Sequence, residues 1–149
     1  MSEYTAVAVT NPHTHDVSAE LVPEADPADV VAKHIQALNT GDWPGLMAQH
    51  PDSIEMHLPG GTVVRGREAV GNLYAAFTLP RAQRGMGGLT FTEQSRCEVG
   101  NTIIVNWRAT ADFLAEPYYG SDAYVCDDGL MVAIVGTMDG SKLVFKTTE

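Results

Sequence analysis

The stretch from residue 30 to residue 77, VVAKHIQALNTGDWPGLMAQHPDSIEMHLPGGTVVRGREAVGNLYAAF, decides the fold. The sequence predicts a helix that begins just before this stretch and ends within it. Asp26 is a good N-cap, Pro27 suits the first helical position and Gly41 provides a stop. One polar residue, His34, shares the apolar stripe of this helix. The rest of the stripe, at helical spacing, consists of Val30, Val31, Ile35 and Leu38.

The remainder of the stretch predicts a strand between two further helices. A shorter helix is expected at about 43–50 and another at 67–77, with its apolar side at Val70, Leu73, Tyr74 and Phe77. Residues 53–58 alternate as a strand, with one face apolar. Glu55 and His57 fall on its other face. The turn at 59–61 then returns the chain along 62–64.

Beyond residue 88 the pattern is typical of consecutive strands joined by turns. A loop at 79–88 and a connector at 116–120 separate them from other segments. Strands are expected at 89–99, 102–114, 122–126, 130–138 and 142–146. Helices first and a long antiparallel meander afterwards indicate an α+β fold with the helices on one face of the sheet.

Composition limits the classes of partner. The 149 residues suffice for one domain with a core, and the chain is 44% hydrophobic and 19% charged. A formal charge of −10 argues against nucleic acid, whose phosphates are neutralised by Lys and Arg. No run approaches the roughly 18 apolar residues of a membrane span, and the first residues do not resemble a signal peptide. We therefore expect a cytoplasmic protein without membrane contact.

Residues 1–25 lack a helical or strand period and are interpreted as an arm, flexible or packed on a partner, ahead of a single domain at 26–149. His13 and His15 are interpreted as solvated, with metal binding as the alternative. Cys97 and Cys126 have no metal-ligand spacing, so buried or half-buried free thiols are expected, with a disulfide or metal site as alternatives.

Three motifs carry a family resemblance. ALNTGDWPGL at 37–46, RGREAVGNLY at 65–74 and GSDAYVCDDGLMV at 120–132 occur in the order seen in ketosteroid isomerases and related polyketide-cyclase-like proteins. The chain thus resembles the nuclear-transport-factor-2-like superfamily over about 28–146. The resemblance implies a cystatin-like cone, in which a curved antiparallel sheet packs against about three N-terminal helices. It also implies a pocket for a small apolar organic ligand, and a homodimer.

The resemblance also proposes catalytic residues. It puts His57 where a ketosteroid isomerase has its base, His34 at the position of the oxyanion-hole tyrosine, and Asp122 near the oxyanion-hole aspartate. A histidine can exchange protons at neutral pH, and a buried aspartic acid can stay protonated and donate a hydrogen bond. The alternatives are a core histidine at 34, a solvent-facing histidine at 57 and a turn aspartate at 122.

A second polar group belongs to one face of the strand at 102–114. Relatives of limonene epoxide hydrolase need an Arg and two Asp residues, but the residue two positions after Arg108 is Thr110 and not Asp, and Gly136 stands where the other Asp would be. This departure counts against epoxide hydrolysis. An exposed or dimer-forming surface is the expected role of the group, which comprises Asn106, Arg108, Thr110 and Asp112.

These observations lead to two functional hypotheses. The first is a cofactor-independent acid–base enzyme, an isomerase, dehydratase or cyclase acting on a small apolar carbonyl or polyketide-like molecule. The second is a ligand-binding or dimerising accessory domain without catalysis. Neither a metal nor an organic cofactor is expected. The residues expected to line the pocket are Tyr74, Trp43, Met56 and Tyr124.

Overall fold

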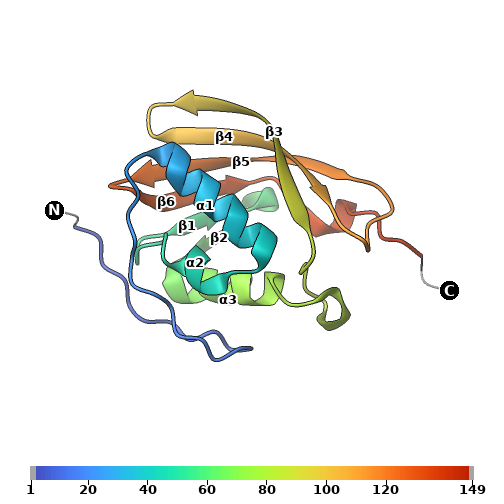
Figure 1. The fold of residues 1–149 in the computed structure, drawn as a ribbon, viewed down its shortest axis with the longest axis horizontal. Helices are drawn as coiled ribbons and strands as arrows, with labels where there is room; N and C mark the ends of the chain where they lie inside the picture. The colour runs from blue at the N-terminus through green and yellow to red at the C-terminus, as the bar shows by residue number, and fades with distance from the viewer. Residues whose placement is uncertain (1–2, 148–149) are drawn as a thin grey trace.

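In the computed structural model, which describes residues 3–147, helices lie against one face of a curved six-stranded sheet (Figure 1). The three α-helices are α1 (Pro27–Thr40), α2 (Trp43–Met47) and α3 (Arg67–Phe77). The strands are β1 (Glu55–His57), β2 (Val63–Arg65), β3 (Thr90–Val99), β4 (Thr102–Thr110), β5 (Tyr118–Asp127) and β6 (Leu130–Gly136). Short 3-10 helices lie at Pro59–Gly61, Arg81–Gln83 and Gly140–Lys142. This architecture confirms the predicted α+β fold.

Both ends of α1 are as the sequence predicts. Pro27 is its first residue, after Asp26 in an extended conformation. Gly41 ends it with φ 66°, a left-handed conformation that glycine adopts without steric cost. The chain can therefore reverse within two residues and begin α2 at Trp43. Its indole N–H donates to the Gly71 carbonyl of α3 at 2.9 Å, which ties α2 to α3.

The strands follow the order β2-β1-β6-β5-β4-β3. Consecutive strands from β3 to β6 pair antiparallel, so the predicted meander is confirmed. The short strand β1 pairs antiparallel with β2 and parallel with β6. This parallel pair joins the N-terminal half of the chain to the last strand, and no local sequence pattern predicts it.

The elements match the expected ranges to within a few residues, and the two largest differences lie in the C-terminal half. Strand β5 already begins at Tyr118, inside the segment interpreted as a connector. Residues 142–146 do not form a strand. The Asp139 carboxylate accepts hydrogen bonds from the Ser141 backbone and hydroxyl, which favours a 3-10 turn, and only an isolated bridge between Leu114 and Phe145 follows.

The core lies between the helices and the inner face of the sheet. Alternation along β4 is regular: Ile103, Val105, Trp107 and Ala109 are buried, while Asn106 is exposed on the opposite face. Helix α1 contributes Val30, Val31 and Ala37 to the same core, together with His34, which is 2% exposed. Burial of these apolar side chains provides the main stabilisation of the fold.

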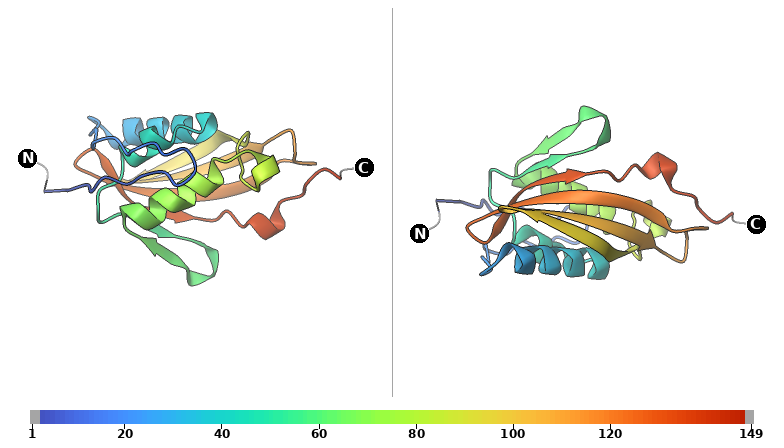
Figure 2. Two further views of the ribbon diagram at one scale, coloured as in Figure 1. Left: turned by 90° about the horizontal axis from the view of Figure 1, so that it is seen from below. Right: turned by 90° about the horizontal axis from the view of Figure 1, so that it is seen from above.

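The N-terminal arm packs on the chain's own domain. Within the described residues 3–25, Val9 and Asn11 are buried, and the Val22 amide donates to the Ala48 carbonyl at 2.9 Å. The arm runs beside α2 and α3, on the side away from β3 (Figures 1 and 2). The contacts of the described arm residues are thus with this chain, and the division into an arm and one domain at 26–149 stays a prediction.

One buried arginine connects the arm to the helices. Arg67, 2% exposed, donates through Nε to the Val7 carbonyl at 2.8 Å and through Nη2 to the Ser18 hydroxyl at 2.9 Å. Its Nη1 donates to the carbonyls of Met47 and His50. Hydrogen bonds from a buried charged donor to carbonyls hold the arm strongly to the helices, because breaking one of them leaves a buried polar group unpaired and costs free energy.

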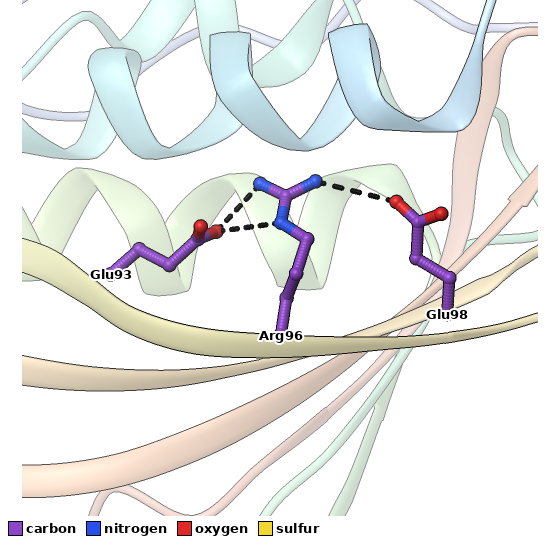
Figure 3. Close-up of polar contacts among 3 residues, drawn as sticks. All are labelled: Glu93, Arg96 and Glu98. Carbon is purple, nitrogen blue, oxygen red and sulfur yellow. Dashed lines mark hydrogen bonds and ion pairs between the residues drawn. The ribbon is translucent and has the colours of Figure 1, made fainter.

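Edge strand β3 carries charges on the sheet face toward α1. Arg96 donates to Glu93 Oε1 through Nε at 3.0 Å and through Nη2 at 2.6 Å. Its Nη1 lies 3.6 Å from Glu98 Oε1 (Figure 3). By register these three residues lie opposite inward-facing residues of β4, and their side chains lie between β3 and α1 in Figure 3. Charges on an edge strand oppose pairing with a further strand.

The outer face of β3, β4 and β5 has no helix packed on it among residues 3–147 (Figure 2). Apolar residues exposed on the strands include Val99, Tyr119 and Val135, at 64%, 62% and 48%. Cys97 is exposed and Cys126 buried, and both are free, so the expected burial holds for Cys126 alone. No described helix combines the length and apolarity that crossing a membrane requires.

Replacing Arg67 by Met is expected to lower the free energy of unfolding by about 3 kcal/mol, because it leaves several buried carbonyls without donors. Urea denaturation followed by circular dichroism measures this loss. Arg65→Met is the matched control, since the Arg65 side chain is 66% exposed, and its loss is expected to stay within about 0.5 kcal/mol. Equal losses in the two variants would contradict the tethering role of Arg67.

The homodimer expected from the resemblance stays a prediction. A homodimer gives a mass of twice the 16.0 kDa chain in sedimentation equilibrium at micromolar concentration. Val135→Lys on the outer face is expected to shift the mass toward one chain, while Val144→Lys, a similarly exposed valine outside the sheet, leaves it unchanged. A single-chain mass for the unaltered protein at all concentrations would contradict this prediction.

Candidate functional site

A cavity of about 300 Å³ lies between α1, α3 and the inner face of the sheet. This volume is at the lower end of the range for small-molecule sites, roughly 300–1,000 Å³. Apolar side chains from both helices and four strands form most of the wall, among them Leu38, Met56, Leu73, Phe77, Phe91 and Trp107. The polar side chains that reach the cavity are His34, Tyr74 and Asp122. Such a lining suits a small, mostly apolar molecule with one or two polar groups.

Asp122 enters the cavity from β5. It lies opposite Gly136 of β6, and a Cβ placed on Gly136 would come within 3.4 Å of Asp122 Oδ1. The glycine therefore leaves the carboxyl uncovered on that side. The Tyr124 hydroxyl, from the same strand, donates to Asp122 Oδ2 at 3.0 Å.

Burial raises the pKa of the Asp122 carboxyl, because the charged form loses its hydration. Hydrogen-bond donors around the carboxyl act in the opposite direction, with Tyr124 first and the Trp107 indole and the Thr137 backbone after it. The Trp107 N–H is buried and reaches hydrogen-bond geometry with no described group. Asp122 is therefore a carboxyl group with an elevated pKa and with donors beside it that stabilise its anion.

His34 reaches the cavity from α1. Its Nδ1 is fully buried and has no partner at hydrogen-bond geometry among the described residues. Burial lowers the pKa of His34 to about 3, neighbouring His50 lowers it further, and the Gln49 side chain opposes the shift. His34 is consequently a neutral imidazole at pH 7. The ring centroids of His34 and Tyr124 lie 5.1 Å apart, and Tyr124 in turn donates its hydroxyl hydrogen to Asp122.

Tyr74 reaches the cavity from α3 and is backed by a second buried histidine. The Tyr74 hydroxyl lies 3.3 Å from His50 Nε2, and His50 Nδ1 lies 3.0 Å from the Met131 carbonyl oxygen. The two rings stack, with centroids 5.7 Å apart and planes 7° apart. Burial lowers the pKa of His50 to about 4 and raises the pKa of Tyr74 above its ordinary value, so both groups are neutral at pH 7.

The structure brings two of the three expected catalytic residues to one cavity and leaves the third outside it. His34 and Asp122 line the cavity, but His57 does not. On β1 the inward position belongs to Met56, so the next residue points to the other face. There His57 Nε2 lies 3.1 Å from Glu55 Oε1, with 41% of its side chain exposed. This geometry gives no support to His57 as the base.

The expected pocket residues divide in the same way. Met56 and Tyr74 line the cavity. Trp43 is core, with its N–H on the Gly71 carbonyl, and Tyr124 lies behind Asp122. Sequence reasoning did not single out Gln49 and His50. Their only local signal is a polar pair at the end of a predicted helix, and their contacts with α1 and β6 are long-range.

The second polar group stays outside the cavity. Arg108 pairs with Thr92 and Tyr119 on the outer face of the sheet, whereas Gly136 does line the cavity. His13 and His15 are exposed in the turn of the arm. Within residues 3–147, no group of three or more His, Cys, Asp or Glu side chains is placed to hold a metal ion.

Comparison with known proteins relates the chain to this fold. A family model described as a SnoaL-like domain matches residues 31–142. An NTF2-like protein of unknown function from Cytophaga hutchinsonii is 16% identical, with a TM-score of 0.60 over 83% of this chain and 95% of its own. No curated protein sequence matches the chain.

Two further solved structures carry functional names. The Delta 5-3-ketosteroid isomerase from Mycobacterium sp. is 20% identical, with a TM-score of 0.64 over 82% of this chain and all of its own. A candidate polyketide cyclase from Sinorhizobium meliloti is 14% identical, with a TM-score of 0.60 over 72% of this chain and 93% of its own. At these identities the similarity establishes a shared fold.

The buried neutral histidines predict a loss of stability in acid. As the pH falls below 6.5, the unfolded chain takes up protons that folded His34 and His50 accept only near pH 3 and pH 4. The free energy of unfolding, measured by urea titration between pH 7 and pH 4, is therefore expected to fall. His34→Gln is expected to make this fall shallower, with His57→Gln as the control for loss of an exposed histidine. An unchanged slope in His34→Gln would contradict this account.

Proposed function

Because this chain belongs to the SnoaL-like domain family, we propose that it binds a small, mostly apolar carbonyl compound in the cavity and moves a proton on it without a cofactor. The observation that carries the proposal is the pairing of Asp122, a carboxyl with a raised pKa, with the neutral imidazole of His34 in an apolar cavity. Perturbed acid–base groups in such a cavity are a physical signature of catalytic sites.

The proposed step uses Asp122 in its protonated form, which the raised pKa of this carboxyl favours. Asp122 donates to the carbonyl oxygen while His34 removes a proton from the neighbouring carbon, which gives an enol, a carboxylate and an imidazolium. The Tyr124 hydroxyl at 3.0 Å stabilises the carboxylate. The two opposite charges offset the desolvation that each would suffer alone. Return of the proton to a different carbon completes an isomerisation, and loss of a neighbouring hydroxyl as water would give a dehydration instead.

A second candidate is a binding domain of the same fold without catalysis. It is favoured by the three methionines of the cavity wall, Met56, Met86 and Met138, whose flexible side chains adapt to ligands of different shape. It is also favoured by the position of His57 outside the cavity. In this case ligands bind, but no proton exchange occurs.

Asp122→Asn and His34→Gln are each expected to lower turnover at least ~100-fold, the share of a positioned acid or base. Enones and hydroxy-ketones are screened in deuterated water, and deuterium uptake next to the carbonyl is measured by NMR. His57→Gln is the matched control and is expected to keep the unaltered rate. Exchange that survives in both cavity variants would remove the two residues from the mechanism, and binding without exchange in the unaltered protein would favour the binding domain.

A further inference from the structure

The proton on buried His50 has a fixed position. Its Nδ1 lies 3.0 Å from the Met131 carbonyl oxygen, and a carbonyl oxygen can only accept a hydrogen bond. Nδ1 therefore carries the hydrogen. Burial keeps the ring neutral by lowering the pKa of His50 to about 4, so Nε2 holds a lone pair and no hydrogen.

This tautomer determines what Tyr74 can offer to a ligand. Its hydroxyl lies 3.3 Å from His50 Nε2, and the acceptor there takes the single hydroxyl hydrogen. The stacked arrangement of the two rings holds this geometry. With that hydrogen on His50, oxygen lone pairs are the remaining hydrogen-bonding capacity of the Tyr74 hydroxyl, and Tyr74 is one of the residues that line the cavity. To a ligand that reaches this hydroxyl, Tyr74 is an acceptor.

His34 adds to the acceptor character of the same wall. Gln49 Nε2 donates to the Val30 carbonyl at 2.7 Å, which leaves Gln49 Oε1 as the buried acceptor end of that amide. The buried Nδ1 of His34 likewise has no other partner among the described residues, and an N–H at Nδ1 suits the Gln49 Oε1 acceptor. With its proton on Nδ1, the neutral ring of His34 leaves Nε2 as a lone pair, which serves as the base of the proposed function.

The carbonyl-binding group occupies the opposite part of the polar surface. Asp122 on β5 lines the cavity as the potential donor, and the buried Trp107 N–H on β4 acts on this carboxyl. Tyr74 belongs to α3, across the cavity from the sheet (Figure 1). The cavity thus has a donor side on the sheet and an acceptor side on the helices.

We propose that the Tyr74–His50 pair is a specificity subsite for a ligand hydroxyl, so that the substrate is a hydroxy-carbonyl compound. Its carbonyl faces Asp122 and its hydroxyl donates to the Tyr74 oxygen. This inference rests on the proposed function and narrows its substrate class. A ligand with an ether or carbonyl oxygen at this place would bring two lone pairs together without a hydrogen, and would leave the Tyr74 oxygen unsatisfied.

The test is a binding comparison of 2-naphthol with its methyl ether, 2-methoxynaphthalene, by isothermal titration calorimetry. The unaltered protein is expected to bind the naphthol at least ~10-fold more tightly, the effect of one satisfied hydrogen bond. Tyr74→Phe keeps the ring and removes the acceptor, so the two affinities are expected to agree within ~3-fold. Phe77→Leu, on the same helix and in the same cavity, is expected to weaken both ligands and keep the preference.

Three outcomes would overturn the inference: equal affinities in the unaltered protein, a preference that persists in Tyr74→Phe, or binding of neither probe. A measurement without any variant checks the origin of the effect. Long-range ¹⁵N–¹H NMR of the unaltered protein is expected to show His50 protonated on Nδ1, and protonation on Nε2 would also overturn it.

The subsite and the proposed catalysis fail separately. A preference for the hydroxyl without any Asp122-dependent exchange removes the catalysis and leaves the subsite. Asp122-dependent exchange without a preference for the hydroxyl removes the subsite and leaves the catalysis.

Discussion

The carbonyl oxygen of Met131 can only accept a hydrogen bond, and the polarity of the helical side of the cavity depends on this constraint. Met131 lies on β6, the strand that β1 joins in parallel, so the sheet topology determines where this oxygen stands. The oxygen fixes the His50 proton, His50 orients the Tyr74 hydroxyl, and Tyr74 then faces the cavity as an acceptor. A backbone atom thereby sets the character of a side chain two groups away.

The second determinant of the chemistry of the cavity is its wall, which is mostly apolar and includes few polar side chains. Because water is largely excluded around Asp122 and His34, burial raises the pKa of the carboxyl and lowers that of the imidazole. Both shifts favour the neutral form of the group. Charge separation between them during a reaction would be supported by Tyr124, while a ligand that offers no proton would leave the pair unchanged.

Much of the fold was predictable because its signals are local. Helix α3 occurs at the predicted residues, α1 begins and ends at the predicted proline and glycine, and alternation predicted β4. The motifs from ALNTGDWPGL onward pointed to a family whose model does match the chain. The segment at 142–146 was predicted as a strand but does not form one. The Asp139 side chain caps a 3-10 turn at its start, and strand propensity takes no account of such a side-chain contact.

The sequence alone also placed two residues of the site, His34 on an apolar helical stripe and Asp122 in a motif of the family, because both signals are carried by neighbours in the chain. For His57 the sequence contained conflicting information. Alternation put it on the face of Glu55, away from Met56, whereas alignment on the family pattern made it the base, and the structure follows the alternation. Only tertiary structure could bring Gln49 to His34 and His50 to Tyr74 and Met131, since these contacts join residues up to 81 positions apart. Protonation states, tautomers and the donor or acceptor role of each group arise from such contacts, and for that reason the chemistry of the cavity was decided by the folded chain.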